Sequence, residues 1–418
     1  AMTIAEIGAT AALITASDGT GELGPFDLDF GFKPPTKLGF SVDAKVIEGG
    51  GFLGIEELDD GSRKYSGAAA FSLFEGALGL AAFGLVITGP DRFSMLVSVT
   101  ANFTPIQLGF GFTLNGIGGL LGINRTLDPV ALGEGARKGQ LDAVLFPKDA
   151  AKDAERILGN LDAFFPELTG SYVFGAMVII GYQKFIEARL GVVITFPTPL
   201  RIALLGQLHA SLPKGEGVVR INLDVVGILD ITAKRISVDA GLYDSEIAKF
   251  SVSGQMAMRL AFGRRREFLL AVGGFHPAFV PPDGFPALAR LRLGADFGDY
   301  VNIGFQIYFA ITSNTLQFGG AFDLFVGTDE FNIRGGAHFD ALLTFRPFAF
   351  RADIGMHVGI TLFGVDLLAA SLELALSGPA PQWRAAGTAS FTIAGIEKTR
   401  SFARMFGPKY EDEALEVV

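Results

Sequence analysis

The chain of 418 residues has no cysteine, one tryptophan and only four histidines. Without cysteine it cannot form a disulfide or a cysteine-ligated metal site. The histidines are His209, His276, His338 and His357, and no two of them have the spacing of a metal-binding pair such as His-x-x-x-His. These absences favour a protein with no metal and no cofactor.

Positive charge is also in deficit. The chain has 34 Lys and Arg against 44 Asp and Glu, a formal net charge of −10. Nucleic-acid binding requires clustered basic residues that neutralise phosphates, so this balance argues against it. The same balance disfavours binding to an anionic membrane surface by charge alone. No signal peptide is recognised, and the sequence leaves the cellular location open.

Motifs for catalysis are missing as well. No G-x-S-x-G nucleophile elbow occurs. The glycine-rich stretch around Gly116 to Gly122 departs from the spacing of a dinucleotide-binding loop, and no Lys-Ser or Lys-Thr completes a P-loop. We therefore predict no catalytic residue and expect that the chain is not an enzyme.

The sequence is rich in glycine and phenylalanine, with 55 and 39 residues. Hydrophobic residues make up 49% of it, and its mean hydropathy is +0.40. From Tyr300 to Phe363, apolar residues alternate with small or polar ones over long segments. Period-two alternation predicts β-strands with one apolar face. The segments are separated by turn residues at Ser313-Asn314, Gly327 to Asp329, and Pro347, which predicts an antiparallel meander.

We therefore predict an all-β, mainly antiparallel fold, built as a large curled meander sheet or a barrel or tunnel, with one small α-helical insert. The predicted segments are an N-terminal β segment (1–127), a helical insert (128–166) and a C-terminal β meander (167–418), the last forming one continuous β unit with the first. Ala389 to Ile396 is the last predicted strand, and the acidic residues 408–418 are expected to fray.

The insert contains two predicted helices. Val130 to Lys138 follows Asp128, a good N-cap residue, and Pro129. Asp149 to Phe164 places apolar residues on one side and charged residues on the other. Two arrangements are open for this insert: it packs on the sheet or plugs one end of it, or it is a crossover that joins two β halves.

Eight residues are predicted to line an apolar ligand site on the meander: Phe305, Phe309, Phe318, Phe322, Phe339, Phe350, Ile354 and Val358. The loop Gly273 to Leu288 carries four prolines, which keep it out of a central strand. Its Phe275, Phe279 and Phe285 are predicted to form a lid or partner contact; the alternative is a buried Ω-loop that closes the core.

On the polar side of the meander, four residues would share a face if their strands pair: His338, Asp340, Asp353 and His357. We interpret them as a surface polar cluster and not as an acid–base or metal site.

Three functions fit this sequence. The first is a non-enzymatic binding protein whose apolar groove or tunnel holds lipid or another hydrophobic ligand. Transfer of a sixteen-carbon chain from water is worth roughly 12 kcal/mol before ordering costs, so such binding needs no polar recognition. The second is a structural or assembly scaffold with a self-filled core, with a protein partner or flanking domains. The third is an outer-membrane-type β-barrel, which the spread of Phe residues along the strands disfavours.

Several stretches resemble a bacterial family known as a domain of unknown function, DUF6603. The stretches are Phe93 to Pro129, Val144 to Leu161, Gly273 to Leu288 and Leu376 to Ile393. The resemblance is spread over most of the chain. It implies a large Gly- and Phe-rich β protein, often part of a longer chain, and brings no activity, cofactor or catalytic residue.

Overall fold

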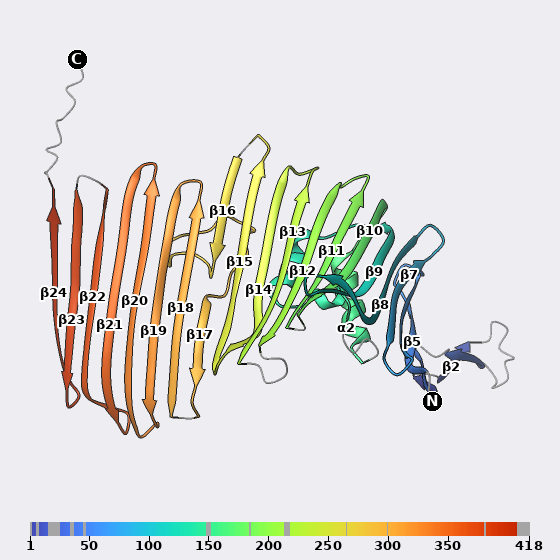
Figure 1. Ribbon diagram of the computed structural model, residues 1–418, viewed down its shortest axis with the longest axis horizontal. Coiled ribbons are helices and arrows are strands. Elements are labelled where there is room, and N and C mark those ends of the chain that lie inside the picture. The colour runs from blue at the N-terminus through green and yellow to red at the C-terminus, as the bar shows by residue number, and fades with distance from the viewer. Residues whose placement is uncertain are drawn as a thin grey trace, which may run out of the picture. The chain divides into compact units, whose positions relative to one another are not determined.

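The computed structural model is dominated by β-strands (Figure 1). The residues it describes are 2–5, 8–15, 26–33, 37–44, 47–147, 152–183, 185–212, 218–264, 266–298, 300–379 and 382–407. The predicted fraying segment 408–418 lies outside them. All strand pairs with a defined register are antiparallel, as the alternation predicts.

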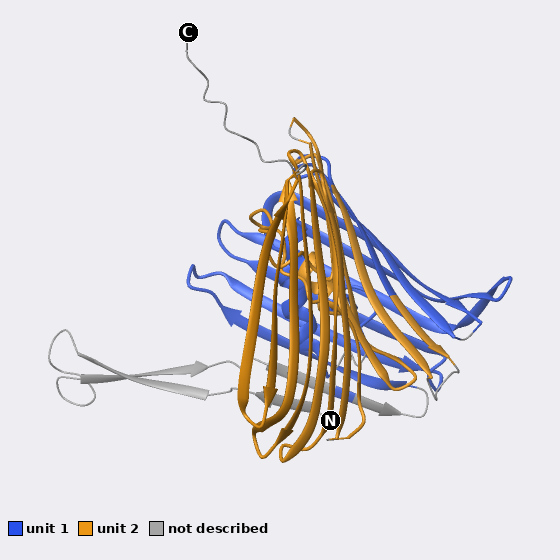
Figure 2. Ribbon diagram, turned by 90° about the vertical axis from the view of Figure 1, so that its left-hand side faces the viewer, with its two compact units in different colours: residues 1–132, 140–207, 230–232 blue, residues 133–139, 208–229, 233–418 orange. Residues whose placement is uncertain are grey.

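The chain forms two compact units, coloured separately in Figure 2. Unit 1 comprises residues 1–132, 140–207 and 230–232, and unit 2 comprises residues 133–139, 208–229 and 233–418. Each unit is described by itself below.

Unit 1 is built from successive antiparallel hairpins. Its strands are β1 (Met2–Ala5), β2 (Gly8–Thr15), β3 (Phe26–Lys33), β4 (Lys37–Ala44), β5 (Ile47–Glu57), β6 (Arg63–Leu73), β7 (Leu78–Thr88), β8 (Phe93–Gly109), β9 (Phe112–Arg125), β10 (Glu167–Tyr182), β11 (Ile186–Phe196) and most of β12 (Arg201–Leu212). β2 pairs with β3 and β1 with β4, and each strand from β4 to β11 pairs with the next.

The helical insert leaves the sheet after β9 and returns as β10, which is hydrogen-bonded directly to β9; its residues 133–139 belong to unit 2 and the rest to unit 1. It contains α1 (Pro129–Arg137), the 3₁₀ turn η1 (Leu141–Ala143) and α2 (Ala154–Phe164). The predicted N-cap is confirmed, because the Val130 N–H donates to Asp128 Oδ1 at 2.8 Å. The second helix begins later than predicted, at Ala154, and residues 148–151 lie outside the described range.

The insert packs on one face of the unit 1 sheet. Leu145, Ile157 and Phe165 are fully buried. The buried Arg125 of β9 donates to Asp162 of α2 at 2.5 Å and to the Phe165 carbonyl at 3.0 Å. Arg189 of β11 donates to the Phe146 carbonyl at 2.8 Å. The apolar interior on this face is therefore filled by the chain's own side chains, in agreement with the first of the two predicted arrangements.

Unit 2 contains most of β13 (Val219–Asp230) and the meander that follows it. The strands are β14 (Arg235–Ile247), β15 (Phe250–Phe262), β16 (Arg266–Val272), β17 (Leu291–Asp296), β18 (Val301–Thr312), β19 (Thr315–Gly327), β20 (Phe331–Phe345), β21 (Phe348–Leu362), β22 (Val365–Pro379), β23 (Trp383–Ile393) and β24 (Ile396–Phe406). The predicted breaks at Ser313-Asn314, Gly327 to Asp329 and Pro347 are confirmed as the β18–β19, β19–β20 and β20–β21 turns.

β16 and β17 share one place in the unit 2 sheet. Both pair with β15 on one side and with β18 on the other, over different parts of those strands. The loop between them, residues 273–290, therefore leaves and re-enters the middle of the sheet. Gly273, at φ +69°, begins this exit, and a Cβ there would lie 2.6 Å from the Ile307 carbonyl oxygen, so the position requires glycine.

The end of the meander differs from the prediction. The predicted last strand, Ala389 to Ile396, is in fact the end of β23, a turn, and the start of β24. Ala394 and Gly395 both have positive φ, +50° and +79°, as a two-residue hairpin turn requires. Ala394 has no turn signal in the sequence, so the additional strand β24 was missed.

Candidate functional site

The eight predicted lining residues lie on one face of the unit 2 sheet, because the strand registers align their positions. Four adjacent rows of directly paired residues carry seven of the eight across β18 to β23 on this face. In strand order the rows are Ile303, Leu324, Gly335, Val358, Ala370 and Phe391; Phe305, Phe322, Ala337, Met356, Leu372 and Ala389; Ile307, Gly320, Phe339, Ile354, Leu374 and Gly387; and Phe309, Phe318, Ala341, Ala352, Leu376 and Ala385. None of the 24 is polar, and we call this surface the apolar face of unit 2. Phe350 belongs to the next row, opposite Leu343.

The apolar face is accessible to solvent. Phe339 is 46% exposed and Val358 51%, and the other Phe and Ile side chains of the prediction are exposed or half-buried. Phe305 and Phe322 contact each other with ring centroids 4.9 Å apart. Contiguous exposed apolar surface of this kind marks an interaction site in a soluble protein.

The row pattern changes at β24. Here Phe391 pairs with Lys398, Ala389 with Arg400 and Ala385 with Arg404, while Phe402 continues the remaining row. Three cations therefore lie on the same face as the apolar rows, at their end. These cations are not among the residues predicted from the sequence, although Lys398, Arg400, Phe402 and Arg404 already show period-two spacing.

The predicted lid loop packs on the opposite face. The His276 N–H donates to Gln317 Oε1 at 3.0 Å, and Gln317 lies between Leu316 and Phe318 in β19, so its side chain points away from the apolar face. Phe275, Phe279 and Phe285 cluster together, with centroids about 5 Å apart. The loop is therefore not placed to cover the eight apolar residues, because its anchors are on the polar side of the sheet.

A polar cluster lies beneath this loop. In the register, Asp340 is directly opposite Asp353, His338 opposite Gly355 and His357 opposite Gly336, so the four residues share a face as predicted. Tyr308 donates to Asp340 Oδ1 at 2.7 Å. Burial, strengthened by that hydrogen bond, raises the pKa of Tyr308 well above its usual range, which keeps it a proton donor.

His276 of the loop lies against this cluster, near Asp353, and is only 2% exposed. Its Nδ1 accepts from the Ala278 N–H at 3.0 Å, which places the proton of the neutral ring on Nε2. Nε2 has no hydrogen-bond partner and lies 3.8 Å from Asp353 Oδ2. Burial lowers the pKa of His276 against the opposing effect of Asp340 and Asp353. The neutral ring therefore supports the loop internally, through the Ala278 N–H, and approaches the cluster only at Asp353.

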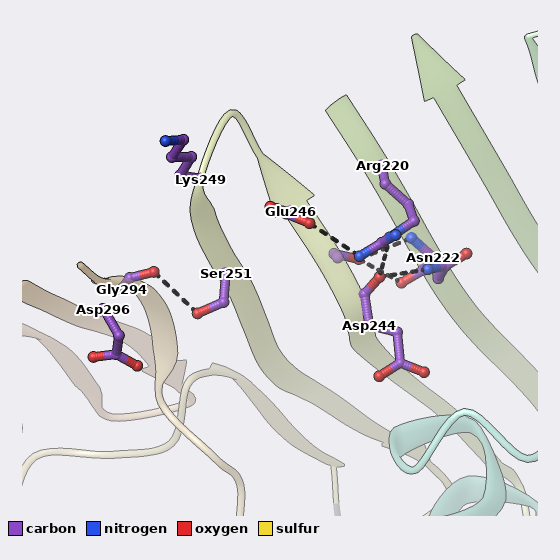
Figure 3. A pocket seen from close by; sticks show the side chains of 9 residues that line it. Arg220, Asn222, Asp244, Glu246, Lys249, Ser251, Gly294 and Asp296 are labelled. Carbon is purple, nitrogen blue, oxygen red and sulfur yellow. Dashed lines mark hydrogen bonds and ion pairs between the residues drawn. The ribbon is translucent and has the colours of Figure 1, made fainter. Parts of the chain in front are cut away.

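A polar recess of unit 2 lies at a bulge of β14 (Figure 3). Arg220 donates to the Asp244 carbonyl at 3.1 Å and to Glu246 at 3.0 Å, and Ser251 donates to the Gly294 carbonyl at 3.0 Å. Its charged groups are largely committed to neighbouring chain atoms, so this recess is a weaker candidate than the apolar face.

Unit 1 also exposes apolar side chains on the face of its sheet away from the insert. Phe174, Phe196, Ile117 and Leu204 are exposed, and Phe174 stacks on Phe196 at a centroid distance of 5.5 Å. This surface provides a matched reference for experiments on unit 2.

Within the part of the chain that the structure describes, no three His, Asp or Glu side chains are grouped so that they could hold a metal ion. In the same residues, none of the helices has the length and apolarity needed to cross a membrane.

Comparisons with known proteins agree with the resemblance noted in the sequence. No curated protein and no solved structure matches the chain. A family model described as a family of unknown function, DUF6603, matches residues 1–417. Since the match covers nearly the whole chain, the protein belongs to the DUF6603 family.

Proposed function

We propose that the protein is a non-enzymatic binding protein whose apolar face of unit 2 holds a long-chain hydrophobic ligand. The observation that supports this is the uninterrupted set of four apolar rows, exposed over six strands. The proposal concerns unit 2, where the rows are continuous; in unit 1 the insert covers one face of the sheet.

An open sheet face removes water from one side of a ligand only. If half of a sixteen-carbon chain is desolvated, the gain is roughly 6 kcal/mol, or a Kd near 40 μM before ordering costs. Binding of this strength requires many adjacent apolar contacts, which the rows supply.

The test combines extraction with a matched pair of double variants. Protein purified without detergent is extracted into organic solvent and the extract analysed by mass spectrometry, and Nile red binding is measured by fluorescence. Phe318→Ser with Phe339→Ser, exposed by 39% and 46%, is compared with Phe174→Ser with Phe196→Ser on unit 1, exposed by 48% and 39%.

We expect the unit 2 variant to lose most of the co-purified ligand and to bind Nile red about tenfold more weakly, because two ring contacts are worth roughly 1.4 kcal/mol together. The unit 1 variant should retain both. An empty extract together with equal Nile red affinity in the two variants would refute the proposal and favour a scaffold.

A further inference from the structure

We propose that the ligand of the apolar face is an anionic amphiphile, whose head group is bound by Lys398, Arg400 and Arg404 of β24. This inference rests on the proposed function and specifies its ligand class. The geometry places the hydrocarbon chain along the rows, across the strands, and the negative head group at β24, where the rows end.

The three cations share the face of the rows by register. Each pairs directly with an apolar residue of β23 that belongs to a row. Positions 398, 400 and 404 are separated by even numbers of residues, so their side chains project to the same side, with Lys398 about 7 Å and Arg404 about 14 Å from Arg400 along the strand. The apolar surface and the positive charges are therefore continuous.

These cations are available to a ligand. All three are exposed, and within the described chain none of their side chains forms an ion pair or a hydrogen bond. The residues opposite them on β23 are Phe391, Ala389 and Ala385, which offer no carboxylate. Three arginines elsewhere on the described unit 2 strands are ion-paired: Arg220 with Glu246, Arg259 with Asp239 and Arg351 with Asp353.

Charged side chains on a strand can also serve to discourage unwanted strand pairing. That role does not require the charged side chains to lie on one face of the strand. On the other face of β24 lie Glu397, Thr399, Ser401, Ala403 and Met405, with a single charge of negative sign. The segregation of three cations to the apolar side is what points to an anionic head group.

The head-group chemistry follows from the residues. Guanidinium groups form paired hydrogen bonds with carboxylate or phosphate, and a lysine ammonium adds a mobile point charge. The chain as a whole carries −10, so its net charge does not attract anions and their binding requires a local group of cations.

The experiment separates the contribution of the charged head group from that of the hydrocarbon chain of the ligand. Dodecyl phosphate and dodecyl maltoside, each below its critical micelle concentration, are used to displace Nile red from the full protein. We expect dodecyl phosphate to bind at least about tenfold more tightly than dodecyl maltoside, as charge-assisted hydrogen bonds predict.

Two triple variants each remove one lysine and two arginines. Lys398→Gln, Arg400→Gln and Arg404→Gln should weaken dodecyl phosphate to the level of dodecyl maltoside and leave the maltoside unchanged. Lys234→Gln, Arg264→Gln and Arg266→Gln remove one lysine and two arginines from exposed hairpin ends of the same unit and should change neither.

Equal affinity for the two amphiphiles, or no effect of the β24 variant on dodecyl phosphate, overturns this inference and leaves the proposed function intact. If neither amphiphile displaces Nile red, the proposed function fails with it. Binding only to vesicles of phosphatidylcholine and phosphatidylglycerol, with no displacement by the monomers, would identify a membrane-docking face and also overturn the inference.

Discussion

Asp239 of β14 is fully buried between two arginines. It forms ion pairs with Arg137, which ends α1, and with Arg259 of β15. Gln255 also donates to the Arg137 carbonyl at 3.0 Å. The carboxylate therefore joins the helix end to two strands of unit 2, and its removal would leave two cations without their partner.

We predict that Asp239→Ala lowers the free energy of unfolding by about 3–5 kcal/mol, the usual cost of breaking a buried ion pair by removing one partner. Urea denaturation followed by circular dichroism measures the change. The control is Asp323→Ala, whose carboxylate is exposed and which should stay within about 0.5 kcal/mol of wild type. Similar losses in both variants would show that the ion pairs are not responsible.

His276 gives unit 2 a dependence on pH. Its pKa is lowered in the folded protein, chiefly by burial, so the folded state favours the neutral ring. The stability that this histidine contributes is present above its unfolded pKa of about 6.5 and is lost as the pH falls below that value. Protonation of Nδ1 would also remove the acceptor for the Ala278 N–H.

We therefore predict that the free energy of unfolding declines between pH 6.5 and pH 5.5, and that His276→Gln reduces this decline. Urea denaturation at each pH provides the measurement, with His357→Gln, on the exposed surface, as the control. If the slope is the same in wild type and His276→Gln, the buried histidine does not govern this pH range.

At the scale of elements, the pairing of β24, which carries Lys398, Arg400 and Arg404, depends on the β23–β24 turn. Gly395 lies in the left-handed region at φ +79°. An alanine in that region costs about 1–2 kcal/mol, and the cost would fall on the pairing of β23 with β24.

Gly395→Ala should therefore speed amide hydrogen exchange in β24 by roughly tenfold, corresponding to about 1.4 kcal/mol of local stability. The control is Gly359→Ala in β21, where a Cβ would meet only ordinary contacts at 3.7 Å or more. Unchanged exchange in Gly395→Ala would mean that the hairpin does not depend on this glycine.

The elements that the sequence predicts well are those in which the period-two alternation and the turn residues indicate the same strand boundaries. The meander from Tyr300 to Phe363, the N-cap Asp128 and the common face of the eight apolar residues were all predictable, since alternation determines the face and turn residues determine the breaks. The prolines of Gly273 to Leu288 predict a loop, but its side of the sheet follows from contacts between residues distant in sequence, such as the hydrogen bond from His276 to Gln317, which no local pattern encodes. β24 was missed because Ala394 gives no turn signal.

At the scale of the whole molecule, net charge and exposed apolar surface act against each other. The isoelectric point is near 5.0, and both units expose aromatic and aliphatic side chains. At neutral pH, mutual repulsion keeps chains apart; near the isoelectric point that repulsion disappears.

We predict that light scattering by the protein rises as the pH approaches 5.0 and that Phe318→Ser with Phe339→Ser reduces the rise, because less apolar surface remains for association. The scattering is measured at equal protein concentration from pH 8 to pH 5. Scattering that is identical in wild type and the double variant would show that association uses other surfaces.

The rows on unit 2 suggest a way in which ligand size is set. Adjacent strands lie about 4.8 Å apart, so the apolar face of unit 2 lengthens by about this distance with each strand. If the proposed ligand lies along the rows, its length is matched to the number of strands, whereas a closed pocket selects its occupant by volume. Gain or loss of one hairpin in a relative would then lengthen or shorten the preferred ligand by about 10 Å without a change in its chemistry.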